Sequence, residues 1–167
     1  MRIIIFCLTI LFIPVMVSFS GKGGFSVTST AFTENGYIPA RFTCEGDNIN
    51  PPLKITGAPA GTKSFALILH DPDAPHEGGY THWVMWNIDT KGDIGEYFKG
   101  ADQGLNTGKR HGYISICPPS GTHHYHFMVY ALDTKLMLDH TTHKEELEKA
   151  MEGHILAKTE LVGLYKK

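Results

Sequence analysis

Three short apolar runs limit what this chain can fold into. They are Ser64–His70, Thr81–Ile88 and Tyr125–Leu132, and each is rich in aromatic, aliphatic and β-branched residues. Each run is too short for a typical helix and carries apolar residues on both faces in places, as strands covered on both sides do. The sequence therefore predicts a mainly β fold in which these runs are the central strands of a sheet.

The rest of the chain is predicted to supply shorter strands and a C-terminal helix. Alternation and turn residues predict strands at Phe25–Phe32, Tyr37–Phe42, Leu53–Thr56, Gly112–Ile116 and Thr159–Tyr165. Thr142 and Glu145 have the spacing of a capping box, and the apolar residues that follow predict a helix ending near Gly153. We expect this helix to cover one face of the sheet.

The first 20 residues have the composition of a secretory signal peptide. Arg2 precedes an apolar run from Ile3 to Val17, and small residues follow up to Ser20. Pro14 interrupts the run, which is shorter than the roughly 20 apolar residues of a spanning helix, so an uncleaved anchor is the weaker alternative. We expect a signal peptide at 1–20, cleavage near Ser20, one domain at 21–167, and an exported protein, periplasmic or secreted, without a transmembrane segment.

The charge of the predicted mature chain argues against two classes of partner. Loss of residues 1–20 removes Arg2, so 14 of the 15 basic residues remain against 17 acidic ones, a net charge of −3 with neutral histidines. A mildly acidic domain has no electrostatic attraction to nucleic acid or to an anionic bilayer surface. Neither partner is expected, and the sequence leaves a monomer and a homodimer equally open.

Two cysteines, Cys44 and Cys117, remain in the predicted mature chain. In an oxidising compartment they could form a disulfide, but buried free thiols are also common in a domain that has a full core. The sequence leaves both alternatives open.

Polar residues gather at the ends of the three predicted central strands. Asp71 and Asp73 follow the first run, and His82 lies near the start of the second. If these two strands are antiparallel, the two ends meet at one rim of the sheet. The loop before the third run adds His123 and the stiff Pro118–Pro119 pair, so we expect a preformed concavity there.

The residue types at this rim favour recognition of a small charged group. A carboxylate beside an imidazole favours the imidazolium, which donates charge-assisted hydrogen bonds to phosphate or carboxylate oxygens. The same aspartate could accept from an ammonium group, so the pocket suits an anion or a zwitterion such as phosphoethanolamine. Tyr80, Trp83 and Tyr125 are candidates for its apolar walls.

Several ordered motifs over about residues 25–165 resemble a known family. They are FTCEGDNINPPL, DPDAP, THWVMWNI, GYISICPPSGTHHYHFMVYALD and GHILAKTELVGLY. Together they resemble the phosphatidylethanolamine-binding proteins, most closely the bacterial Raf-kinase-inhibitor-like branch. The resemblance implies an antiparallel β-sandwich with a large central sheet, a smaller sheet, one or two short C-terminal helices and an anion-binding pocket at one end. Similar proteins bind phosphate, phosphorylated head groups or acetate, and some eukaryotic members regulate kinases or flowering.

The resemblance also assigns the pocket residues. Carried over position by position, they are Asp71, Pro72, Pro75, His82, Pro118, Pro119, His123 and Tyr125. Two positions depart from the family pattern: Ser115-Ile116 replaces a common Gly-Pro, and His124 replaces a common arginine. The side chain in place of glycine hinders close backbone approach to a phosphate. With one fixed positive charge fewer, we expect weaker anion affinity.

Three other functions compete with ligand binding. His124 and His126 share a strand face and could join Asp71 or His82 in a zinc site, but no ligand spacing supports a metal. A weak hydrolase could use Asp71, His82 and His123 with Ser120 or Cys117 as nucleophile, although the Gly-x-Ser-x-Gly motif is absent. A protein-interaction module that inhibits a kinase or protease is the third. We expect a binding protein that is not an enzyme and needs no cofactor.

Overall fold

Residues 24–167 are described by the computed structural model, so the predicted signal peptide at 1–20 lies outside the described residues. Nine strands, one α-helix and a 3-10 turn make up this part of the chain. The strands are β1 Ser26–Ser29, β2 Gly36–Tyr37, β3 Leu53–Thr56, β4 Ser64–Asp71, β5 Tyr80–Ile88, β6 Asp93–Ile94, β7 Asp102–Gln103, β8 Thr122–Leu132 and β9 Ile155–Lys166. The 3-10 turn is η1 Ala40–Phe42 and the helix is α1 Lys144–Met151.

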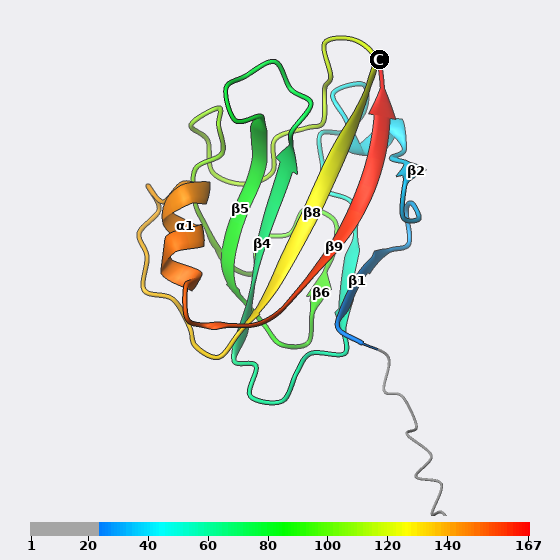
Figure 1. Ribbon diagram of the computed structural model, residues 1–167. Coiled ribbons are helices and arrows are strands. Elements are labelled where there is room, and N and C mark those ends of the chain that lie inside the picture. Colours follow the sequence, from blue (N-terminus) through cyan, green and yellow to red (C-terminus); the bar gives the residue numbers. More distant parts are fainter. Residues whose placement is uncertain (1–23) are drawn as a thin grey trace, which may run out of the picture.

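The strands form a large sheet and a small one. The large sheet has the order β2-β9-β8-β4-β5-β7, and the small sheet has the order β1-β3-β6 (Figure 1). The predicted mainly β fold with two sheets is confirmed. One pair departs from the predicted antiparallel arrangement: β2 runs parallel to β9. The chain leaves β1 in the small sheet, turns at Asn35 and joins the edge of the large sheet in the direction of β9.

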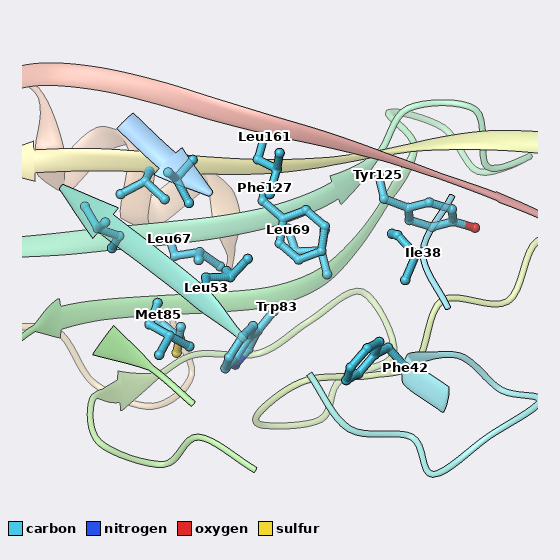
Figure 2. Close-up of a cluster of buried hydrophobic side chains, with 14 of the residues drawn as sticks. Ile38, Phe42, Leu53, Leu67, Leu69, Trp83, Met85, Tyr125, Phe127 and Leu161 are labelled. Atoms are coloured by element: carbon cyan, nitrogen blue, oxygen red, sulfur yellow. The ribbon is translucent and has the colours of Figure 1, made fainter. Parts of the chain in front are cut away.

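The central strands are apolar on both sides because two cores cover the large sheet. An inter-sheet core packs residues of β4, β5 and β8 against residues of the small sheet (Figure 2). A helix-side core packs the opposite face against Leu147 and Met151 of α1. Trp83 belongs to the inter-sheet core and Trp86 to the helix-side core, as their odd spacing predicts.

The helix covers the sheet as predicted but begins later than the capping box at Thr142 and Glu145 suggested. Thr142 closes a turn by donating its N–H to the Asp139 carbonyl, and its own carbonyl accepts from Leu105. His143 is therefore the N-cap, and its N–H donates to the Glu146 carboxylate at 2.9 Å. The eight-residue helix α1 is short, and within residues 24–167 no helix has the length and apolar character to cross a bilayer.

Two predicted strands are wrong. Pairing in the stretch Tyr37–Phe42 stops at Tyr37, because Pro39 has no N–H for a ladder and instead begins the turn η1. The segment Gly112–Ile116 forms only an isolated bridge, between Ile116 and Thr43. The predicted C-terminal strand is confirmed and is longer than expected, spanning Ile155–Lys166.

Candidate ligand-binding site

The loops that carry the predicted site meet at one end of the large sheet. Strand β4 pairs antiparallel with β5, so Asp71 lies opposite Tyr80. Strand β8 pairs antiparallel with β4, so its first residues reach the same end, at the top of Figure 1. The antiparallel geometry expected for Asp71, His82 and His123 is therefore present.

Asp71 and His123 form a buried pair at this end. The Nδ1–H of His123 donates to Asp71 Oδ2 at 2.8 Å, and the side chains are only 3% (Asp71) and 8% (His123) exposed. Asp71 Oδ1 also accepts from the backbone N–H of Asp73 at 2.9 Å, so both carboxylate oxygens have partners. Buried ionisable pairs add little to stability and are frequent where a chain keeps charge for recognition.

His82 lies beside this pair but has a different electrostatic role. Its Nδ1–H donates to the Ile114 carbonyl at 3.0 Å. Burial lowers the pKa of His82 to about 4, more than the Ile114 carbonyl and the Asp71 carboxylate raise it. His82 is therefore neutral at pH 7, with Nε2 as an acceptor. The general expectation that a carboxylate favours an imidazolium therefore does not apply to His82, because desolvation outweighs the neighbouring carboxylate.

Tyr125 lies between the two imidazoles. Its ring centroid is 5.5 Å from that of His82 and 6.4 Å from that of His123. Its hydroxyl is buried and has no hydrogen-bond partner among the atoms of residues 24–167. Burial, reinforced by the Asp71 carboxylate, raises the pKa of the Tyr125 phenol, so the group stays a hydrogen-bond donor.

An open cavity of about 490 Å³ lies at this rim, and we call it the ligand pocket. Five predicted residues line it, namely Asp71, Pro75, Tyr80, His82 and Pro119; the others that line it are Cys44, Ala74, His76, Ile114, Ser115 and Cys117. Ala74 and His76 lie in the same 71–80 loop as the predicted residues. Their place in this loop could have identified them as pocket residues from the sequence. Cys44, Cys117 and Ile114 lie in segments without regular secondary structure. The sequence pattern could not place such segments beside the pocket.

The remaining predicted residues lie near the ligand pocket without lining it. Asp73 is exposed, and its carboxylate accepts from the backbone N–H of His124 at 2.8 Å and from His124 Nδ1 at 2.7 Å. These hydrogen bonds, led by the side-chain one, lower the pKa of Asp73. His123 and Tyr125 lie buried behind the pocket, Pro72 is exposed and Pro118 is buried. Trp83, expected as a wall, is in the inter-sheet core.

The two cysteines are joined at the pocket wall. Cys44 and Cys117 form a disulfide with a Cα–Cα distance of 5.4 Å. A backbone hydrogen bond joins the same two segments, because the Cys44 N–H donates to the Ile116 carbonyl at 3.0 Å. Cys117 therefore has no free thiol to act as the nucleophile of a hydrolase.

The histidines do not gather into a metal site within the described residues. His124 hydrogen bonds to Asp73 and His126 to Glu160, so the two imidazoles have separate acidic partners. Over residues 24–167, no three histidine, cysteine, aspartate or glutamate side chains are grouped to hold a metal ion.

Comparison with known proteins identifies the family. The family model for phosphatidylethanolamine-binding proteins matches residues 28–166. The chain belongs to this family. It is 50% identical over 150 residues to a UPF0098 protein of Pyrococcus horikoshii, covering 83% of this chain and 75% of that protein. It is 48% identical over 145 residues to a UPF0098 protein of Methanothermobacter thermautotrophicus, covering 82% and 95%.

Two solved structures of the phosphatidylethanolamine-binding protein family resemble the fold along nearly their whole length. A homologue from Chlamydia trachomatis is 39% identical with a TM-score of 0.83, and the match covers 86% of this chain and 98% of that one. YbcL of Escherichia coli is 32% identical with a TM-score of 0.80, covering 87% and 99%. The predicted family is thus confirmed.

Proposed function

We propose that this protein is an exported binding protein whose ligand pocket recognises a small phosphorylated or carboxylated group, and that it is not an enzyme. The family name supports a ligand with a phosphate and an ammonium group, as in the phosphoethanolamine head group. The observation that carries the proposal is the buried Asp71–His123 pair, whose aspartate lines an open pocket.

The charges around the pocket favour a zwitterion over a simple anion. No lysine or arginine is among the residues that line it, and His82 is neutral. Within residues 24–167, Asp71 is the one acidic residue that lines the pocket, and it accepts a hydrogen bond from His123 at 2.8 Å. The Asp71 carboxylate can therefore accept from an ammonium group, while the hydroxyl of Tyr80, which lines the pocket, can donate to the phosphate. A zwitterion adds no net charge to the pocket, whereas an inorganic anion adds an uncompensated negative charge beside the Asp71 carboxylate.

Titration by NMR tests this proposal. Phosphoethanolamine, inorganic phosphate and ethanolamine are each added while the imidazole C–H signals of His82 and His123 are recorded. We expect saturable shifts of both signals, with the tightest binding for phosphoethanolamine. Asp71→Asn should weaken ethanolamine and phosphoethanolamine at least tenfold.

A matched control uses an aspartate–histidine pair that is exposed to solvent. His154 Nδ1 lies 2.9 Å from Asp133 Oδ1, and both side chains are 46% exposed to solvent. Asp133→Asn should leave every titration unchanged. Binding of phosphoethanolamine that is equal in Asp71→Asn and Asp133→Asn would refute the assignment of the pocket.

The absence of catalysis is a proposal of its own. It is supported by the disulfide at Cys117, which removes a nucleophile, and by Ser120, which is not among the lining residues of the pocket. We expect no hydrolysis of p-nitrophenyl esters or p-nitrophenyl phosphate above buffer. Turnover that is abolished in His123→Ala and kept in the surface control His140→Ala would overturn it.

Export is supported by the composition of residues 1–20 and by the paired cysteines, since disulfides persist in oxidising compartments. Intact mass measurement of the protein purified from the extracytoplasmic fraction of its host should give a chain that starts near Gly21. A chain that keeps residues 1–20 and fractionates with the cytoplasm would contradict export.

A further inference from the structure

A second cavity of about 650 Å³ is lined by residues 48–50, 97–99, 101–103 and 111–113 with His140. We call it the Tyr97 cavity. It shares no lining residue with the ligand pocket. The segment 111–115 separates the two cavities, since His111, Gly112 and Tyr113 face one and Ile114 and Ser115 face the other.

Tyr97 is held at the rim of this cavity in a costly conformation. Its φ is +56°, a left-handed value that aromatic residues rarely adopt, and 65% of the residue is exposed to solvent. An exposed aromatic ring gains little from burial that would offset this strain. Strained backbone of this kind persists where neighbouring contacts enforce it, and such positions cluster at binding sites.

Two sets of hydrogen bonds enforce the strained turn. Asn50 is buried, its Nδ2 donates to the Gly95 carbonyl at 2.8 Å, and its Oδ1 accepts from the Phe98 N–H at 3.0 Å. Arg41 donates two hydrogen bonds to the Glu96 carboxylate, at 3.0 and 2.6 Å. These hydrogen bonds hold the residues on both sides of Tyr97, and Tyr97 itself lines the cavity.

The polar groups of the Tyr97 cavity favour an uncharged ligand rich in hydroxyls. Lys99 and Asp102 contribute one charge of each sign, so the cavity offers no excess charge for a phosphate. Asp102 uses one oxygen to accept from Asn87 Nδ2 at 2.7 Å, which leaves its other oxygen for a ligand. The Trp83 indole N–H donates to Gln103 Oε1 at 2.9 Å. The NH₂ group of Gln103 is therefore the part of its amide that can donate to a ligand.

The aromatic groups define the shape of the ligand. Phe98 and Tyr113 line the cavity with Tyr97, together with the imidazoles of His111 and His140. The faces of aromatic rings are negative and attract the polarised C–H bonds on the flat side of a sugar ring. From this combination of ring faces, amides and balanced charge, we propose that the Tyr97 cavity is a binding site for a neutral saccharide.

Tryptophan indole signals provide the test, because the chain contains two tryptophans in different environments. Methyl β-D-glucopyranoside or N-acetylglucosamine is added at up to about 20 mM, well above a Kd of about 1 mM. The Trp83 indole N–H donates to Gln103 at the cavity wall and should shift saturably. Trp86 lies in the helix-side core and should stay unchanged as an internal reference.

Glycine and asparagine tolerate a positive φ, so Tyr97→Gly and Tyr97→Asn remove the ring without adding strain. Both should weaken sugar binding at least tenfold. Tyr37→Ala is the matched control, because Tyr37 is 62% exposed and lies on strand β2, outside the cavity.

Three results would overturn the proposal. The first is no saturable Trp83 shift with either sugar, and the second is wild-type binding by both Tyr97 variants. The third is an equal loss in Tyr37→Ala. Failure of phosphoethanolamine to bind the ligand pocket leaves this site unaffected, since the two cavities share no residue.

Discussion

Removal of the Asp71 carboxylate should leave two donors without their acceptor, and the resulting loss of stability can be estimated. In Asp71→Ala, the buried Nδ1–H of His123 loses its acceptor, which costs about 2–3 kcal/mol. The backbone N–H of Asp73 also loses its acceptor but is only partly buried, which adds about 1 kcal/mol. The expected decrease in the free energy of unfolding is therefore about 3–4 kcal/mol.

The conservative variant Asp71→Asn should lose less. The introduced amide keeps an oxygen that can accept from the Asp73 N–H and stays within hydrogen-bond reach of His123, so we expect a loss of about 1–2 kcal/mol. The control Asp133→Ala breaks an exposed aspartate–histidine contact and should cost below about 1 kcal/mol.

Urea unfolding at pH 7, followed by tryptophan fluorescence and far-UV circular dichroism, measures these differences. With a slope of about 2 kcal/mol per molar urea, Asp71→Ala should lower the midpoint by about 1.5–2 M. An Asp71→Ala midpoint indistinguishable from that of Asp133→Ala would refute the reasoning, because it would show that the carboxylate does not satisfy buried donors.

Three further predictions concern the disulfide, His82 and His124. Replacing Cys44 and Cys117 by serine should lower the free energy of unfolding by about 4 kcal/mol, because the disulfide closes a loop with a sequence separation of 73; a midpoint unchanged from the oxidised protein would contradict this. His82 has a folded pKa of about 4, below its unfolded value, so its contribution is fully present above about pH 6.5 and decreases as the pH falls. Between pH 7 and pH 4 that decrease should amount to about 3 kcal/mol in urea melts, and His82→Asn should be less sensitive to pH by this amount. His124→Arg should tighten inorganic phosphate several-fold by calorimetry, since it adds a fixed positive charge; equal affinities would remove the explanation for weak anion binding.

The central strands were predictable because their residues satisfy two cores at once. Leu67 and Leu69 face the small sheet while Ala66 and Ile68 face the helix side, so the run is apolar throughout. The strand predicted at 112–116 is wrong, because the contacts of this segment are isolated. Ile114 donates its N–H to the carbonyl of His82 on β5, but the segment 112–116 forms no strand, and single contacts of this kind leave no periodic pattern in the sequence.

The location of the site was predictable, but its electrostatics were not. Antiparallel pairing alone brings Asp71, His82 and His123 to one end of the sheet. Which imidazole the aspartate contacts depends on side-chain direction, and it is His123 that donates to Asp71. Likewise, Asp73 turns outward to His124, a contact that strand spacing does not determine.

A crystal structure with phosphoethanolamine tests the central claim most directly. The account predicts the ligand in the pocket lined by Asp71, His82 and Pro119, with its ammonium group within hydrogen-bond distance of the Asp71 carboxylate. A ligand bound elsewhere, or a pocket that holds only water in crystals soaked at saturating concentration, would contradict it.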